Sequence, residues 1–192
     1  GIMAVGIAAG FLATSHQVIL LGRTQSRAKE QEVEILALTK TMNPDWEASG
    51  AKLVTGEIAS WADWSEVIWV IETIKEDMQL KQELFASLDQ RVPEHIPIGS
   101  NSSGFPISKI SAGLKTAHRM FNAHYFMPAH IVPLVEVVLG EKSDPVMGEQ
   151  VCQLYRQAKK KPVLVRKDIP GFLANRIQHA LMREALSLVQ DG

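Results

Sequence analysis

This chain of 192 residues has a single cysteine, no excess of charge of one sign and no long apolar run. Cys152 is the single cysteine, so it has no partner for an internal disulfide and no second sulfur for the usual zinc or redox spacings. We expect it to be a small buried apolar residue, and we expect no metal site. The 20 basic and 21 acidic residues give a net charge of −1, which does not favour nucleic acid or an acidic membrane surface. A small molecule is therefore the expected partner.

Segments that would direct the chain to a membrane or out of the cell are also absent. Gly, Pro or charged residues interrupt each apolar run before the roughly 18 residues that a membrane-spanning helix needs. No secretory leader precedes the first pattern, and the protein is expected to be soluble and cytoplasmic. The chain opens at Gly1 within a motif and stops at Gly192, where a helix would continue into a connection. We therefore expect it to be part of a longer protein.

Strand and helix patterns alternate along most of the chain, which predicts a doubly wound, mainly parallel α/β domain of the Rossmann type. Small and apolar residues fill the first helix, and short continuous apolar runs are typical of buried parallel strands. Strands are predicted at 18–21, 52–55, 67–71, 96–99, 121–125, 134–139 and 162–166, and helices at 1–12, 26–42, 60–65, 78–88, 145–159 and 173–190. Residues 1–167 are read as a dinucleotide-binding domain that lacks its first strand, and residues 168–192 as the first helix of an all-α second domain.

Two short segments at strand ends are candidates for cofactor binding. Gly1-Ile2-Met3-Ala4 fits the second half of a G-x-G-x-x-G/A fingerprint, in which a helix N-terminus receives a pyrophosphate. A plain buried helix would have the same composition. Gly22-Arg23 follows the next strand, where an acidic residue usually holds the ribose 2′-hydroxyl of NAD. Losing the acid and gaining an arginine favours NADP, although a solvated polar turn would also explain these residues.

His124 and Glu136 form the candidate acid/base pair. They stand twelve positions apart on two predicted strands, with Pro128 and Pro133 between them, so neighbouring strands would bring them together. A carboxylate beside an imidazole fixes its tautomer and favours its protonated form, which suits proton exchange near neutral pH. From spacing alone, a structural role is the commoner explanation for His124 and for His130.

Several separated segments together resemble the 3-hydroxyacyl-CoA dehydrogenase family, which includes carnitine and gulonate dehydrogenases and a lens crystallin. The family's glycine turn, its E-A-x-x-E-x-x-x-x-K-x-x-L-F stretch, its S-N-T-S turn, its H-F-F-N-P run ending in L-V-E-V, and its D-x-P-G-F-x-x-N-R turn all have counterparts. These lie at Gly1 to Ala8, Glu72 to Phe85, Ser100 to Ser103, His124 to Val138, and Asp168 to Arg176. The resemblance covers nearly the whole chain.

The resemblance implies an NAD(P)-dependent oxidoreductase, as in fatty acid metabolism, that acts on a 3-hydroxyacyl-CoA or a related small 3-hydroxy acid. His124 would take the proton from the C3 hydroxyl while hydride leaves C3, and Glu136 would stabilise the imidazolium. Further site residues are implied as well. Ser103 and Asn175 would hydrogen-bond the substrate, Asn101 would seat the nicotinamide, and Glu76 and Lys81 would lie near its ribose. A homodimer formed through a helical second domain is also implied.

Three departures from the family pattern leave other functions open. Met127 replaces the asparagine of H-F-F-N-P, Gly22-Arg23 replaces the acidic residue, and the segment from Gly22 to Lys52 is short where acyl-CoA enzymes help receive the CoA tail. One alternative is an NADP-dependent dehydrogenase of small hydroxy acids, of the carnitine or gulonate type. Another is a catalytically silent nucleotide-binding protein like the crystallin. A third, the 6-phosphogluconate and 3-hydroxyisobutyrate dehydrogenase group, would leave His124 and Glu136 without a role.

Overall fold

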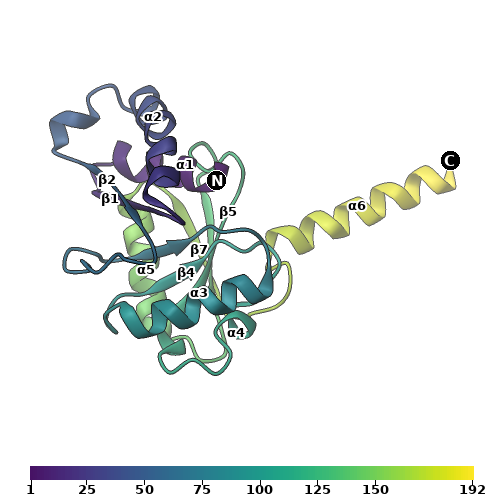
Figure 1. Ribbon diagram of the computed structural model, residues 1–192. Coiled ribbons are helices and arrows are strands. Elements are labelled where there is room, and N and C mark those ends of the chain that lie inside the picture. Colours follow the sequence, from purple (N-terminus) through teal and green to yellow (C-terminus); the bar gives the residue numbers. More distant parts are fainter.

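The computed structural model describes residues 1–192 and confirms an α/β architecture (Figure 1). The strands are β1 (Val18–Gly22), β2 (Leu53–Glu57), β3 (Val70–Glu72), β4 (Ile98–Ser100), β5 (Met120–Tyr125), β6 (Leu134–Leu139) and β7 (Lys161–Val165). The helices are α1 (Ile2–Ala13), α2 (Gln25–Met42), α3 (Met78–Arg91), α4 (Ile107–Ile110), α5 (Pro145–Gln157) and α6 (Ala174–Asp191), with short 3-10 turns η1 (Trp46–Ser49) and η2 (Ala117–Arg119).

The strands form two sheets rather than one. β1 pairs with β2, and the second sheet has the order β3-β4-β5-β6-β7. All neighbours are parallel except β5 and β6, which run antiparallel. The expectation of a mainly parallel sheet is therefore confirmed. No ladder joins β1 to β3, and the expectation that a strand precedes Gly1 stays a prediction.

Helix α1 packs closely because its residues are small. Eight of its twelve residues are buried, and its core contacts include Ile35 of α2 and Trp46 of η1. A β-carbon on Gly6 would lie 3.1 Å from the Ala129 β-carbon, so the glycine lets α1 approach the turn that follows β5. The small-residue pattern thus fixes α1 between the β1–β2 sheet and that turn.

Two predictions between β2 and α3 are wrong in detail. Residues 60–65 form a mostly irregular segment rather than a helix, because the Asp63 carboxylate accepts hydrogen bonds from the Ser65 backbone and hydroxyl and so offers the chain an alternative to helical bonds. The predicted strand at 67–71 is shortened to begin at Val70. Its neighbour β4 is preceded by Pro97, which has no N–H to extend the ladder.

Helix α6 projects away from the rest of the molecule (Figure 1). No residue of this helix is buried, and large apolar side chains such as Ile177, Leu181 and Leu188 are exposed. The predicted long helix with an uncovered apolar face is confirmed, whereas its assignment to a second domain stays a prediction. None of the helices combines the length and apolar character needed to cross a membrane.

Candidate active site

His124 and Glu136 face each other as direct partners across the antiparallel pair β5–β6. His124 Nδ1 lies 2.7 Å from Glu136 Oε2, and both side chains are buried. The predicted approach of the two groups is confirmed. It depends on the strand pairing, because opposite residues of an antiparallel ladder project to the same face of the sheet.

The surroundings of Glu136 decide which nitrogen of His124 carries the proton. Burial by itself would raise the pKa of the Glu136 carboxyl, but hydrogen bonds from His124, from Ala174 N and from Leu173 N hold it below its usual value. An ionised carboxylate only accepts hydrogen bonds. His124 Nδ1 is therefore the donor, and in the neutral ring Nε2 keeps its lone pair free to accept a proton.

Two aromatic rings flank the imidazole. The ring centres of Phe126 and Phe172 lie 4.5 and 5.5 Å from that of His124. Phe172 is completely buried beside Val138 and Val165. These apolar neighbours fix the plane of the imidazole and strengthen its electrostatic interaction with Glu136 by excluding water.

The predicted substrate-binding residues Ser103 and Asn175 meet at the start of α6. Asn175 Nδ2 donates to the Ser103 carbonyl at 3.1 Å. The Ser103 hydroxyl and the Asn175 side-chain oxygen have no hydrogen-bond partner within the protein. Asn101 joins the ends of β4 and β5, because its Oδ1 accepts from Tyr125 N at 2.9 Å. Its two amide N–H donors remain available for a ligand.

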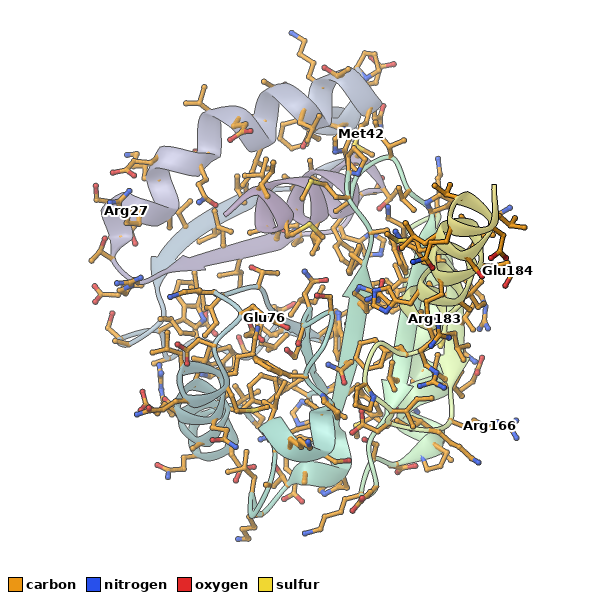
Figure 2. The ribbon with its side chains drawn as sticks, turned by 90° about the vertical axis from the view of Figure 1, so that its right-hand side faces the viewer. Arg27, Met42, Glu76, Arg166, Arg183 and Glu184 are labelled. Carbon is orange, nitrogen blue, oxygen red and sulfur yellow. The ribbon has the colours of Figure 1, made fainter.

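Lys81 and Glu76 occupy different positions relative to solvent. Lys81 is buried, and its ammonium contacts both oxygens of Glu72 at 2.8 and 2.9 Å and Glu76 Oε2 at 3.3 Å. The Glu76 side chain is 41% exposed and lies near the middle of the face in Figure 2. A cofactor ribose can therefore meet the Glu76 carboxylate, while Lys81 holds that carboxylate from behind.

Sequence reasoning missed three residues of this network. Glu72 also accepts from the Ser100 hydroxyl at 2.6 Å, and the Ser102 hydroxyl donates to Glu76. Ser102 in turn accepts from Phe105 N at 2.8 Å, which ties the turn after β4 to the acidic cluster. An available signal was Glu72 itself, since an acid that ends a buried apolar strand requires a partner.

The first residues of α1 have space for a ligand. A β-carbon on Gly1 would meet nothing within 4 Å, and Gly1 and Ile2 are exposed while Met3 and Ala4 are half-buried. Gly1 is the N-cap residue of α1, which is the kind of position at which a helix binds phosphate.

The end of β1 has no room for an acidic side chain. A β-carbon on Gly22 would lie 2.8 Å from both Ala28 N and Thr24 O. Arg23 next to it is exposed and makes no ion pair. A carboxylate does stand on the adjacent strand, since Glu57 is the ladder partner of Gly22.

Met127 precedes a cis peptide bond to Pro128 and is 63% exposed. Lys160 supports the turn that follows, because its ammonium donates to the carbonyls of Ala129 and Val132 at 2.5 and 2.9 Å. Met127 therefore lies on a well-anchored turn two residues after Tyr125, the last residue of β5. It offers an apolar surface where the resembled family has an amide.

Comparisons with known proteins show which family the chain belongs to. The family described as 3-hydroxyacyl-CoA dehydrogenase, NAD binding domain, matches residues 1–169. The chain is 36% identical over 137 residues to 5-formyl-3-hydroxy-2-methylpyridine 4-carboxylate 5-dehydrogenase of Mesorhizobium japonicum, which covers 71% of this chain and 43% of that protein. It is 32% identical over 198 residues to L-carnitine dehydrogenase of Nocardiopsis dassonvillei, covering 100% of this chain and 59% of that protein.

A solved structure shows the same fold. The crystal structure of 3-hydroxybutyryl-CoA dehydrogenase from Escherichia coli matches with a TM-score of 0.88 at 27% identity, over 100% of this chain and 41% of that one. The chain thus spans about half the length of the relatives named here. It belongs to the 3-hydroxyacyl-CoA dehydrogenase family and contains that family's NAD-binding domain.

Proposed function

We propose that the protein transfers hydride between the C3 hydroxyl of a 3-hydroxyacyl-CoA, or of a related small 3-hydroxy acid, and a nicotinamide cofactor. The observation that carries this proposal is the buried His124–Glu136 contact of 2.7 Å beside Ser103 and Asn175. In the oxidation direction, His124 Nε2 accepts the hydroxyl proton while Nδ1 stays bonded to Glu136. The carboxylate then stabilises the positive charge on the ring. The cofactor supplies the hydride acceptor.

The chain's own residues fit a nicotinamide dinucleotide. Gly1 is the N-cap of α1, Asn101 has free amide donors, and Glu76 presents an exposed carboxylate that can accept from ribose hydroxyls. Ser103 and Asn175 keep unused polar atoms for the substrate oxygens. These groups supply a donor and acceptor set for the cofactor and for a hydroxyl or carbonyl substrate.

We infer further that NADP is preferred over NAD. Arg23 is exposed and unpaired, and the tight turn at Gly22 leaves no carboxylate on β1 to repel a 2′-phosphate. A guanidinium forms charge-assisted bonds with phosphate oxygens.

A small hydroxy acid of the carnitine type is the second candidate substrate. Met127 at an exposed position and the relatives named L-carnitine dehydrogenase favour it. A free hydroxy acid would need no CoA-binding surface.

A substrate panel on the full-length protein tests these proposals. 3-Hydroxybutyryl-CoA and L-carnitine are assayed with NAD and with NADP, for the wild type and for His124→Gln. We expect His124→Gln to lower turnover about 100- to 10,000-fold while leaving cofactor affinity nearly unchanged. His118→Gln is the matched control, because His118 is a partly exposed histidine that contacts Glu94. Turnover that survives in His124→Gln would reject the mechanism, and wild-type protein that binds cofactor without turning over any 3-hydroxy compound would indicate the silent, crystallin-like alternative.

We also infer that the whole protein is a homodimer formed through a helical second domain, which α6 begins and in which its exposed apolar face is covered. The helix exposes several large apolar side chains, and full burial of each one would stabilise the protein by roughly 1.5–3 kcal/mol.

A further inference from the structure

Glu136 contacts two different parts of the molecule with its two oxygens. Oε2 faces His124, whereas Oε1 accepts the backbone N–H groups of Leu173 and Ala174, each at 3.0 Å. Leu173 and Ala174 begin α6, and the N-cap residue Leu173 supplies no side-chain cap of its own. A carboxylate from β6 therefore caps this helix from another part of the chain, in the place where N-terminal N–H groups need an acceptor.

The backbone just before α6 adopts an unusual conformation that delivers these two N–H groups. Gly171 and Phe172 both lie in the left-handed region, with φ of 78° and 49°. A bulky residue rarely occupies this region, so other contacts must hold Phe172 there. Its ring is completely buried against Val138 and Val165 and lies 5.5 Å from the ring of His124.

We propose that the Gly171–Ala174 turn is a positioning element of the acid/base pair, whose two N–H groups hold Glu136 Oε1 and so weaken the attraction of the carboxylate for the imidazolium of His124. This inference rests on the proposed function, because it assigns the turn a part in proton transfer. The turn touches neither substrate nor cofactor in this assignment and acts through Glu136 alone. No property of the side chains at residues 171–174 would have indicated such a role.

The charges around Glu136 determine whether the turn raises or lowers the affinity of His124 for its proton. The positive end of α6 and the two N–H groups neutralise part of the Glu136 charge, so the carboxylate attracts the imidazolium less than it would alone. The neighbouring elements bring mostly neutral side chains to this site. β4 and its turn supply neutral Asn101 and Ser103, and α6 supplies neutral Asn175 and the exposed Arg176.

Gly171→Ala tests the proposal without altering any side chain of the pair. The alanine has space, since its β-carbon would lie 3.6 Å from its nearest neighbours, but the positive φ is strained and moves the following N–H groups. Gly113→Ala is the matched control, because Gly113 has φ of 77°, open space around it and a position in the α4–η2 loop.

We expect Gly171→Ala to move the midpoint of the His124 ring titration, followed by NMR, to higher pH, and to move the pH profile of kcat/KM with it. Glu136→Gln should move both in the opposite direction, and Gly113→Ala should move neither. A Gly171→Ala profile that coincides with that of Gly113→Ala, or that moves with that of Glu136→Gln, would overturn the proposal.

A measurement on the wild type covers the case in which Gly171→Ala does not fold. The amide proton shifts of Leu173 and Ala174 should titrate with the same midpoint as the His124 ring, while that of Ala180, farther along α6, should not. Amide shifts at 173 and 174 that do not follow the ring would contradict the linkage. Because this readout needs no turnover, it is independent of the test with His124→Gln, in which surviving activity would reject the proposed function.

Discussion

Both carboxylate oxygens of Glu72 accept hydrogen bonds from the Lys81 ammonium, at 2.8 and 2.9 Å, and both side chains are buried. Such a pair is costly to break from one side, because the remaining charge stays buried without a partner. The Lys81 ammonium also contacts Glu76, the exposed carboxylate of the proposed ribose site, at 3.3 Å.

Lys81→Met should therefore lower the free energy of unfolding by about 3–5 kcal/mol. It should also raise the Michaelis constant for the cofactor, because Glu76 loses its support. Urea denaturation and steady-state kinetics measure the two effects. Lys75→Met, which removes an exposed lysine nearby, should change neither, and an equal loss in both variants would assign the effect to general surface charge.

Cofactor preference should depend on Arg23. Arg23→Ala should raise the Michaelis constant for NADP roughly 10-fold or more, the loss expected for one charge-assisted bond, with little change for NAD. Lys40→Ala, at the far end of α2, is the control. Equal losses with both cofactors would contradict the proposal, as would a wild-type preference for NAD.

Gly22→Asp should fail to restore an NAD-type site. Its β-carbon would lie 2.8 Å from Ala28 N and Thr24 O, so the turn must shift before the carboxylate can reach a ribose. We expect lower thermal stability and weaker binding of both cofactors, measured by thermal denaturation and calorimetric titration. Tighter NAD binding by a stably folded variant would show that the turn yields more easily than the contacts indicate.

Acid should destabilise the wild type more than Glu136→Gln. The pKa of the Glu136 carboxyl lies below its usual 4.5 in the folded chain, so its contribution to stability is present above that pH and is lost as the pH falls through the lowered value. Urea denaturation at neutral pH and below pH 4.5 should show the difference between the two proteins shrinking in acid. Glu149→Gln, from an exposed ion pair, should show no such convergence.

Dimer formation should depend on the apolar face of α6. Ile177→Glu combined with Leu181→Glu should convert the full-length protein to monomers in analytical ultracentrifugation, because two carboxylates would enter the covered face. Arg183, which Figure 2 labels on the same helix, offers the control Arg183→Gln. A double variant that sediments like the wild type would place the interface elsewhere.

The parts of the site that sequence predicts well are those in which local pairing determines geometry. His124 and Glu136 lie in a hairpin of two regular strands. Side chains alternate between the two faces of a sheet, so the register of the two strands alone determines whether these residues meet. The long helix after residue 173 follows from its regular apolar spacing in the same way.

The parts that sequence predicts poorly depend on hydrogen bonds of backbone groups that lie far apart in the chain, or on which of two acidic residues binds a lysine. Nothing in the residue types of Leu173 and Ala174 reveals that their N–H groups bind Glu136. Lys81 was expected near the ribose, but Glu72 takes most of its donors and keeps it buried. The missing helix at 60–65 has a local cause in the Asp63 side chain, which propensity averages do not weigh.

The antiparallel hairpin β5–β6 has a consequence for how the protein folds. Hairpins of this kind form in roughly 1–10 μs, whereas parallel pairing waits for long loops to close. His124 and Glu136 can therefore meet at an early stage, while the bonds of Glu136 to Leu173 and Ala174 join residues 37 and 38 positions away. In pulsed hydrogen exchange, the amides of this hairpin should be protected ahead of those of β1 and β2, whose pairing spans a much longer loop. His124 and Glu136 would then be in contact before β1 and β2, beside the proposed cofactor site, have paired.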